Sequence, residues 1–531
     1  MKKFNTAGPS VAGMHFMINP LVRIDIEDIE SLIEDQRYFV LHAPRQTGKT
    51  TCLLALMQHL NAQTTYRTLY VNIEAAQAAR GNVAEGMAAI VRALASAASL
   101  HWGDEAASQV ASQMLQTTGP TDWVRSVLEQ WSRSSPRPIV LLLDEVDALV
   151  GDTLISLLRQ IRAGYAQRPS AFPQTIILSG VRDVRDYRMH TAHHEIITGG
   201  SAFNIKAKSL RLGNLSREET TALWLQHEAE TCQRFDPAIW PELWTDTEGQ
   251  PWLVNALGHE CTWEDKSARD RSTPITLEHY KAARERLIYS RTTHLDALSD
   301  KLREPRVNRI MAAMLSGEAT TEHFPEDDLQ YIEDLGLIRL RPELTIANRI
   351  YREVLPREIT FPIQAVLHYT QSWYVTHQRQ LDMPKLLAAF QQFFREHSDA
   401  WIDGFSFKEA GPQLLMQAFL QRIVNGGGRI NREYGLGRKR TDLFIEWPID
   451  EAQGYFGPVQ RVVLELKLWK KGSLDAVLAV GLPQTVDYAR RCGADEAHLI
   501  VFDRRPDSPW DDRIWQREAS EQGWALGVWG A

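Results

Sequence analysis

Four short apolar runs, separated by helical patterns, constrain the fold of the first 210 residues more than any other feature. Each run is continuously apolar instead of alternating, as expected for strands of a parallel sheet that is buried on both faces. Helical patterns such as TTCLLALMQHL and VAEGMAAIVRALASAA lie between them. We therefore predict an α/β domain around a parallel sheet, with strands in RYFVLHA, RTLYVNIE, PIVLLLDE and QTIILSG.

Length and charge limit the classes of protein to consider. At 531 residues the chain is too long for one ordinary domain. Its formal net charge is −8, so any contact with nucleic acid must come from a local basic patch. No run approaches the length of a membrane span, and the N-terminus has no apolar signal-peptide core. The four cysteines show no zinc or disulfide spacing, so we expect a cytoplasmic protein without a membrane partner.

Changes of pattern predict three further segments after residue 210. The next segment is helical, and its first helix opens with a capping box formed by Ser216 and Glu219. Short helices and then two short strands follow, which is the pattern of a winged helix-turn-helix. In the last segment a long helix, GPQLLMQAFLQRIVN, precedes three strand candidates, a helix and another strand. We therefore expect domains at residues 1–210, 211–290, 291–362 and 363–531.

The segment VLHAPRQTGKTT follows the first predicted strand and opens a helix. It matches the phosphate-binding loop pattern, except that alanine replaces the first glycine. In such a loop, backbone N–H groups cradle the phosphates, the lysine reaches the β- and γ-phosphates, and the hydroxyl after it ligates Mg²⁺. We expect the nucleotide to bind Ala43, Pro44, Arg45, Gln46, Thr47, Gly48, Lys49, Thr50 and Thr51, with Thr50 on the metal.

The third predicted strand ends in Asp144 and Glu145, which supply the second half of such a site. Asp144 at the strand tip would hold Mg²⁺, directly or through water. Glu145 would orient the attacking water and take its proton. Because both motifs lie at the ends of predicted strands, we predict that this domain binds Mg²⁺ and ATP and hydrolyses the nucleotide.

These motifs resemble those of the AAA-like P-loop ATPases, especially the STAND and origin-recognition-like branch. LSGVRDVRDYR looks like the sensor 1 region of that family, and TEGQPWLVNAL looks like its GxP motif. The resemblance covers the chain from about residue 15 to about residue 360. It implies that Ser179 or Arg182 senses the γ-phosphate, that Gly249 and Pro251 lie near the adenine, and that ATP favours a homo-oligomer.

The predicted winged segment contains an acidic helix, PEDDLQYIEDLG, which has five carboxylates and neither lysine nor arginine. Proteins that read DNA anchor themselves on phosphates with cationic groups, so these carboxylates would repel a duplex. We expect this segment to pack on the ATPase core in a structural or regulatory role. The carboxylates are Glu326, Asp327, Asp328, Glu333 and Asp334.

The apolar run RVVLELKLWK carries Glu465 and Lys467 on one face, because residues two apart in a strand point to the same side. The two charges could simply pair with each other, since an apolar core disfavours uncompensated charge. Asp442 lies on the preceding strand candidate, and its carboxylate could converge with that of Glu465 on one Mg²⁺. Lys467 could then stabilise the attack of water on a phosphodiester.

This ordered set resembles the PD-(D/E)xK nuclease superfamily, and the helix with Gln484 and Tyr488 resembles that of the RecB-like nucleases. The resemblance implies a restriction-endonuclease-like α/β domain with one or two Mg²⁺ ions held by Asp442 and Glu465. It also implies a further acid, for which Glu409 and Glu433 compete. The predicted architecture is thus a multidomain α/β chain with a P-loop core, a helical lid, a winged helix and a nuclease-like domain.

Charge near the proposed nuclease site is locally basic, with nine basic and six acidic residues between positions 428 and 472. Such residues would flank a nucleic-acid backbone, and we expect DNA more than RNA. The residues nearest to the motif are Arg438, Lys439, Arg440, Lys470 and Lys471.

Two functions from different classes follow from these patterns. In the first, ATP controls a Mg²⁺-dependent DNase that acts on foreign DNA in a prokaryotic cell, as in antiviral defence. In the second, the chain is a STAND-like ATP switch whose C-terminal domain only holds nucleic acid or protein. A helicase or translocase is disfavoured because the chain has one P-loop core and no second RecA-like domain. The patterns leave the trigger, the strand preference and the number of subunits open.

Overall fold

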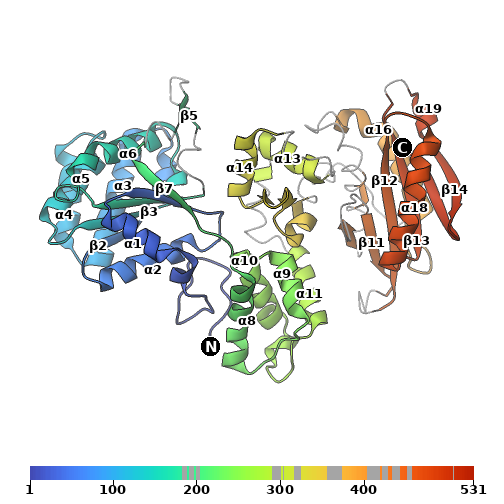
Figure 1. Ribbon diagram of the computed structural model, residues 1–531, viewed down its shortest axis with the longest axis horizontal. Helices are drawn as coiled ribbons and strands as arrows, with labels where there is room; N and C mark the ends of the chain where they lie inside the picture. The colour runs from blue at the N-terminus through green and yellow to red at the C-terminus, as the bar shows by residue number, and fades with distance from the viewer. Residues whose placement is uncertain are drawn as a thin grey trace. The chain divides into compact units, whose positions relative to one another are not determined.

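The computed structural model comprises two compact units, Met1–Ser290 with Gln330–Pro342, and Arg291–Leu329 with Glu343–Ala531, which are described separately (Figure 1). The division into four predicted domains stays a prediction. The structure describes residues 1–181, 188–190, 196–198, 204–289, 301–302, 304–315, 324–355, 374–402, 416, 419–420, 429–432, 443–450, 457–505 and 508–531.

A parallel sheet with five described strands forms the centre of the first unit, in the order β2-β3-β4-β1-β7. The four apolar runs form strands as predicted. The fifth strand, β7, was not predicted because its sequence, KAKSLR, is a polar edge strand without a continuous apolar run. The strands are β1 (Tyr38–His42), β2 (Arg67–Asn72), β3 (Ile139–Asp144), β4 (Thr175–Gly180) and β7 (Lys206–Arg211).

Helices cover both faces of this sheet, and alternate strand residues point into the two layers (Figure 1). One core contains Phe39 and Leu41 together with α1 and α2, and the other contains Tyr38 and Val40 together with α3 to α6. The helices are α1 (Ile26–Glu34), α2 (Lys49–Ala62), α3 (Val83–Ala97), α4 (Glu105–Thr117), α5 (Trp123–Ser134) and α6 (Gly151–Gly164).

The helical run Val83–Trp102 is long and apolar enough to cross a membrane by length and composition, with a mean hydropathy of 1.4. In this structure its α3 part lies in the core of the first unit, where Met87, Ile90 and Leu94 are fully buried. Packing against the sheet therefore accounts for its apolar character.

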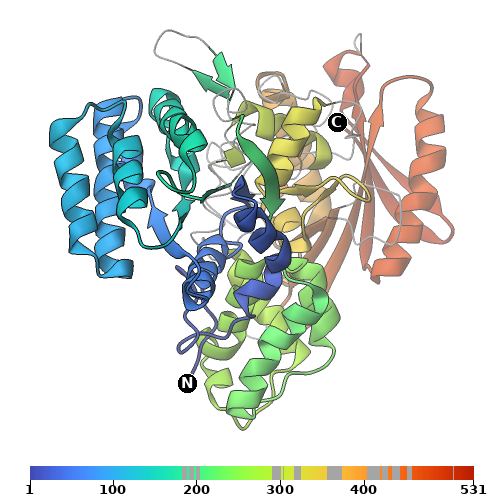
Figure 2. The ribbon, with the colours of Figure 1, turned by 60° about the vertical axis from the view of Figure 1, so that its left-hand side comes forward.

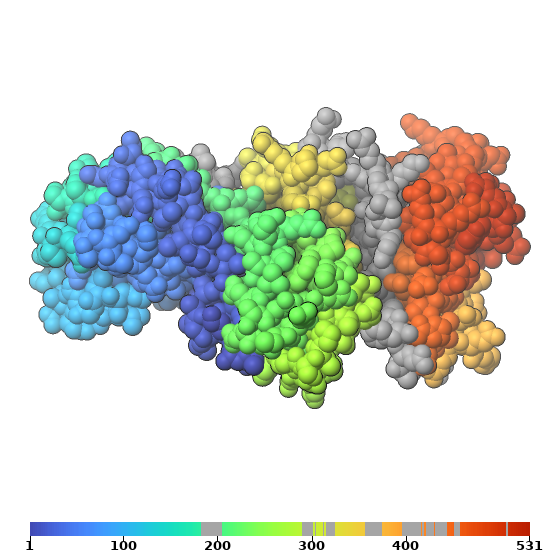
Figure 3. All heavy atoms as spheres, turned by 60° about the horizontal axis from the view of Figure 1, so that its bottom comes forward, coloured from blue at the N-terminus to red at the C-terminus, as the bar shows by residue number. Residues whose placement is uncertain are grey.

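Four described helices of the first unit follow β7, in the segment where the sequence analysis placed a helical lid, and we call them the lid. The capping box is confirmed: Glu219 N donates to Ser216 Oγ at 3.1 Å, and Ser216 N donates to Glu219 Oε2 at 2.7 Å. Trp224 lies at the centre of the aromatic core, and Phe4, near the N-terminus, packs on it. The N-terminal part of the chain, in dark blue, adjoins these helices, in green (Figure 3). The helices are α8 (Arg217–Thr231), α9 (Ile239–Thr247), α10 (Pro251–His259) and α11 (Leu277–Tyr289).

Short elements join these parts of the first unit. The strands β5 (Arg188–His190) and β6 (Ile196–Thr198) form a separate antiparallel pair. The short helices are η1 (Pro20–Arg23), η2 (Glu74–Ala79), η3 (Ala98–Trp102), η4 (Val146–Ala148), η5 (Tyr165–Gln167), η7 (Glu260–Glu264) and η8 (Ser267–Arg269).

The elements expected of a winged helix occur in the expected order. They are α13 (Pro305–Leu315), α14 (Glu326–Asp334), β8 (Ile338–Arg339) and β9 (Thr345–Ile346). The part from Gln330 to Pro342 belongs to the first unit. We call it the docking segment.

The docking segment, which is one part of the predicted winged segment, contacts other residues of the first unit. Arg211 at the end of β7 donates to the Glu333 carbonyl at 2.9 Å and lies 3.5 Å from the Glu333 carboxylate. Arg339 pairs with Glu248 at 2.8 Å. Glu333 of this segment thus pairs with an arginine of β7, and Arg339 of this segment pairs with a carboxylate that follows α9.

The second unit is built on a mixed sheet with six described strands, in the order β10-β11-β12-β13-β15-β14. The strands β10, β11 and β12 are antiparallel neighbours, whereas β13 is parallel to β12 and to β15. The strands are β10 (Arg429–Arg432), β11 (Leu443–Pro448), β12 (Val459–Trp469), β13 (Glu496–Asp503), β14 (Trp515–Glu521) and β15 (Trp524–Gly530).

Helices α18 (Leu474–Cys492) and α16 (Met383–Ile402) lie on opposite faces of this sheet (Figure 2). The order of three strands, a helix and a parallel strand agrees with the prediction. The predicted helix over 411–425 is described only at Met416, Phe419 and Leu420, which are helical and buried. The elements that were not predicted are α16, α19 (Trp510–Arg513), β14 and β15.

Candidate functional site

The phosphate-binding loop joins β1 to α2, and its backbone geometry explains its residue types. Gly48 caps α2 with a φ of 90°, and a Cβ there would lie 2.8 Å from an Arg23 guanidinium nitrogen. Ala43 is fully buried and does not take the left-handed conformation, so alanine is compatible with the loop. Thr47 is buried, whereas Arg45 and Gln46 are exposed at the tip of the loop.

Lys49 is held inside the loop. Its ammonium donates to the carbonyl of Ala43 at 3.0 Å and to that of Pro44 at 3.2 Å. Burial lowers the pKa of Lys49, and the nearby carboxylates of Glu145 and Asp144 oppose this shift. An ammonium so placed can approach phosphate oxygens that enter the loop.

The carboxylate of Asp144 is fully buried at the tip of β3 and accepts four hydrogen bonds. Its Oδ2 accepts from the hydroxyls of Thr50 at 2.7 Å and Tyr70 at 3.0 Å. Its Oδ1 accepts from the Ser179 hydroxyl at 2.8 Å and from Glu145 N at 3.0 Å. The structure thus brings together Thr50, Asp144 and Ser179, which the sequence placed in one site.

Glu145 follows in the left-handed conformation, with a φ of 61°, and is half-buried. Burial raises the pKa of Glu145, Asp147 raises it further, and Lys49 opposes the shift. A raised carboxyl pKa is typical of a group that takes a proton near neutral pH.

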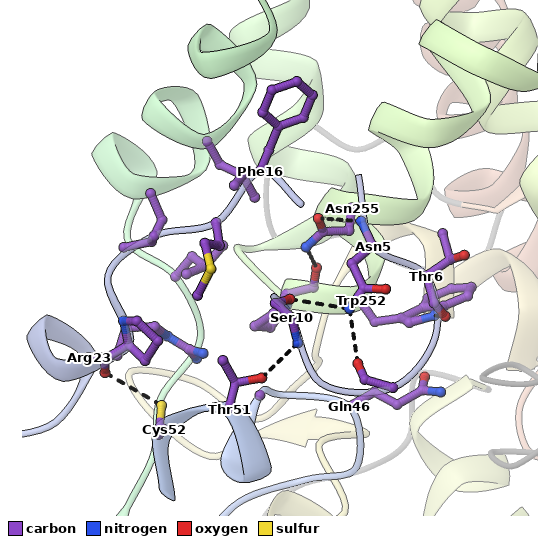
Figure 4. Close-up of a pocket in the computed structure, with 18 of the residues that line it drawn as sticks. Asn5, Thr6, Ser10, Phe16, Arg23, Gln46, Thr51, Cys52, Trp252 and Asn255 are labelled. Carbon is purple, nitrogen blue, oxygen red and sulfur yellow. Dashed lines mark hydrogen bonds between the residues drawn. The ribbon is translucent and has the colours of Figure 1, made fainter. Parts of the chain in front are cut away.

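A cavity of about 120 Å³ lies beside the loop (Figure 4). Its walls come from the N-terminal segment, from the loop with the first turn of α2, and from the lid. Pro251 lines it, and Gly249 has a φ of 70°, where an added Cβ would collide with the Leu215 carbonyl. The cavity therefore adjoins the phosphate-binding loop. Arg182, the alternative to Ser179 as a sensor, lies outside the described residues.

Residues 1–18, which we call the N-terminal segment, form part of the cavity wall and hydrogen-bond to both the loop and the lid. The sequence analysis did not predict this role. Ser10 N donates to the Thr51 hydroxyl at 3.1 Å, and Trp252 Nε1 donates to the Thr6 carbonyl at 2.9 Å (Figure 4). The small and polar residues of NTAGPSVAG have the composition of a loose tail. The sequence feature that indicates packing of this segment is its two phenylalanines, Phe4 and Phe16, which are both buried in the structure.

Arg23 is a second residue that the sequence analysis missed. Its guanidinium donates to the Thr47 carbonyl in the loop at 2.7 Å and to the Gly213 carbonyl before the lid at 2.8 Å. Burial lowers the pKa of Arg23. This side chain links the phosphate-binding loop to the start of the lid.

In the second unit, Glu465 and Lys467 share one face of β12, as the period of a strand predicts. Lys467 Nζ lies 2.5 Å from Glu465 Oε1, and Glu465 is only 2% exposed. Leu464 and Leu466 are buried on the opposite face. The two charges thus pair with each other inside the sheet.

Helix α18 lies over this pair. A Cβ at Gly481 would come within 2.9 Å of Leu499 and 3.5 Å of the Lys467 stem. Gln484 and Tyr488 are half-buried on the same helix, and Tyr488 packs against the core of the unit. Lys470 and Lys471 are exposed at the end of β12.

Several predicted nuclease residues lie outside the described residues. They are Asp442, Glu409, the competitor Glu433, and the basic residues Arg438, Lys439 and Arg440. Within the described part of the chain, no three His, Cys, Asp or Glu side chains are grouped so that they could hold a metal ion. The predicted nuclease metal site therefore stays a prediction.

The chain is similar to several known proteins. Among solved structures, the chain is similar to the Walker-type ATPase PABY2304 of Pyrococcus abyssi, with 15% identity and a TM-score of 0.45 over 66% of this chain and 99% of that chain. It is also similar to Cdc6p from Pyrobaculum aerophilum, with 14% identity and a TM-score of 0.36 over 67% and 97%. For the RuvB Holliday junction branch migration motor of Thermotoga maritima, the values are 14% and 0.32 over 61% and 90%.

No curated protein sequence matches the chain. The family model described as the AAA domain matches residues 33–187. This span contains the phosphate-binding loop, Asp144 with its hydrogen-bond partners, and Glu145. Residues 33–187 are therefore similar to the AAA domain of P-loop ATPases.

Proposed function

We propose that this protein binds ATP with Mg²⁺ and hydrolyses it in the first unit. The observation that carries the proposal is the bond from the Thr50 hydroxyl to Asp144 at 2.7 Å, which joins the two halves of the site. A hydroxyl and a carboxylate are oxygen donors, which suit Mg²⁺ or a water bound to it. Bound Mg²⁺ neutralises charge on the phosphates.

The residues of this chain supply the remaining roles. Lys49 places a positive charge at the phosphates, and the N-terminus of α2 adds backbone N–H donors. Glu145 orients a water molecule and takes its proton. The cavity lined by Pro251 and the N-terminal segment holds the nucleoside and excludes water from one side of it.

Two substitutions separate binding from hydrolysis. Lys49→Ala should abolish nucleotide binding, measured by titration with a fluorescent ATP analogue. Glu145→Gln should retain binding and slow phosphate release by roughly 10²- to 10⁴-fold, because the general base is lost. The control is Lys281→Ala, which removes an exposed lysine from α11. Equal hydrolysis by the wild type and Glu145→Gln contradicts the assignment.

We propose further that the second unit is a Mg²⁺-dependent nuclease that acts on DNA and is controlled by the ATPase. The supporting observation is the placement of Glu465 and Lys467 on the α18 face of a buried strand of a mixed sheet. Asp442 directly precedes Leu443, which pairs with Leu464. The proposal requires the ladder to continue by one pair, because Asp442 would then face Glu465 and share a metal with it.

The alternative is an ATP switch whose second unit only binds nucleic acid or protein. The 2.5 Å pair between Lys467 and Glu465 favours it, because a lysine that neutralises the acid can have a purely structural role. Plasmid and single-stranded DNA should distinguish the two, incubated with Mg²⁺ or EDTA and with or without ATP. Glu518→Gln, at an exposed position on β14, is the matched control for Glu465→Gln. Binding without cleavage supports the alternative.

Three broader proposals rest on family resemblance alone. The protein acts in the cytoplasm of a prokaryotic cell, its substrate is foreign DNA, and ATP favours assembly of several copies. Light scattering of the wild type and Lys49→Ala, with and without ATP, tests the assembly. An unchanged mass in ATP contradicts it.

A further inference from the structure

Tyr70 belongs to no motif of the nucleotide site, yet its hydroxyl lies 3.0 Å from Asp144 Oδ2. The residue lies on β2, where Tyr70 pairs with Leu142 and Asn72 pairs with Asp144. Tyr70 therefore projects from the sheet on the same side as Asp144, toward α2 and Thr50. A tyrosine within the apolar run RTLYVNIE has the sequence appearance of a core residue.

Packing explains the ring of Tyr70 but not its hydroxyl. The ring joins the core formed by α1 and α2, where phenylalanine would pack as well. A buried hydroxyl lowers stability unless it makes a hydrogen bond. The Tyr70 hydroxyl makes this bond as a donor to the Asp144 carboxylate.

Four donors occupy the lone pairs of the Asp144 carboxylate, which offers about four acceptor positions. Tyr70 and Thr50 share Oδ2, while Ser179 and Glu145 N share Oδ1. Because Thr50 donates its proton to Asp144, the lone pairs of the Thr50 oxygen point away from the carboxylate. If the carboxylate rotated, the Thr50 hydroxyl would lose its acceptor. Its proton could then turn toward a bound cation.

We infer that Tyr70 is a positioning residue of the magnesium site: it fixes Asp144 Oδ2, which in turn keeps the lone pairs of Thr50 directed at the ion. This inference rests on the proposed ATPase function. Under this inference, Asp144 acts on the ion through Thr50 and through water bound to the ion. Direct coordination of the ion by Asp144 would displace one of the four donors.

The test is Tyr70→Phe, which removes one oxygen atom and keeps the ring, so the variant is expected to fold; a urea unfolding transition checks this. Affinity for a fluorescent ATP analogue is measured in EDTA and over a range of Mg²⁺ concentrations. In EDTA the variant and the wild type should agree. The increase in affinity caused by Mg²⁺ should fall roughly tenfold, as expected for loss of a bond to a charged acceptor.

The matched control is Tyr38→Phe, which removes a hydroxyl that donates to the Pro173 carbonyl at 2.8 Å in the same sheet. Its Mg²⁺ dependence should equal that of the wild type. If Tyr70→Phe keeps the full Mg²⁺ effect, the inference is wrong although the ATPase proposal stands. If the wild type binds no nucleotide with or without Mg²⁺, the ATPase proposal itself fails. Equal losses in Tyr70→Phe and Tyr38→Phe would also overturn the inference.

Discussion

Gly336→Ala tests whether the docking segment is held against the phosphate-binding loop. Gly336 follows α14 and has a φ of 78°, and an added Cβ would lie 2.9 Å from both Cβ and Cγ of Pro44. Gly493, which ends α18 with a φ of 59°, is the matched control, because a Cβ there would meet nothing within 4 Å among the described residues. Both substitutions therefore impose the left-handed strain, and only Gly336→Ala adds a collision.

The two costs can be estimated separately. Placing alanine in the left-handed conformation costs about 1–2 kcal/mol at either position. The collision with Pro44 adds about 1–3 kcal/mol, the usual range for forcing an extra methyl group into packed structure. The expected losses are therefore roughly 2–5 kcal/mol for Gly336→Ala and about 1–2 kcal/mol for Gly493→Ala.

Thermal unfolding and nucleotide titration provide the assay. A loss of 1 kcal/mol lowers the midpoint by about 2–4 °C for a domain of 150–250 residues, so the excess loss in Gly336→Ala is measurable. Because Pro44 is part of the loop, Gly336→Ala should also weaken nucleotide binding, and Gly493→Ala should not. Equal thermal losses with unchanged nucleotide affinity in both variants would refute the proposed packing of the docking segment on the loop.

Three further predictions concern single side chains. The raised pKa of Glu145 predicts that hydrolysis falls as the pH drops through that pKa, at a higher pH than for an ordinary carboxyl; Glu145→Gln should lose this limb of the pH–rate profile. Glu465→Gln should abolish Mg²⁺-dependent nicking of plasmid, and Lys467→Met should abolish nicking while Mn²⁺ binding persists in electron paramagnetic resonance; ATP hydrolysis should survive in both. Trp252→Phe should lower stability by about 1 kcal/mol in urea unfolding, because the bond to Thr6 is lost.

The nucleotide site could be predicted to the extent that its chemistry is local in sequence. Lys49 and Thr50 follow a strand and open a helix, and Asp144 ends another strand, so parallel pairing brings them to one edge of the sheet. Tyr70 could not be recognised, because its role depends on which strand lies next to β3. The neighbour of β3 is fixed by long-range pairing that local patterns do not contain.

The C-terminal site shows the same limit. Side chains two residues apart in a β-strand point to the same side, so the sequence predicts that Glu465 and Lys467 share one face, and the structure agrees. Whether they pair with each other or meet a metal depends on the residue opposite Glu465, which no local pattern reveals. Strands β7 and β14 were missed for another reason, since both are edge strands whose exposed polar residues replace the continuous apolar run of a central strand.

Because the wall of the cavity joins the N-terminal segment to the lid, the cavity cannot form until the lid has been synthesised. Trp252 and Thr6 are 246 residues apart, and Asn5 and Asn255 are 250 apart. At a synthesis rate of about 5–20 residues per second, roughly 12–50 s separate the two partners on the ribosome. During that interval Phe4 and Phe16 lack their partners on the lid and are exposed to misassociation. This cavity is thus among the last parts of the first unit to form, although the phosphate-binding loop beside it is made early.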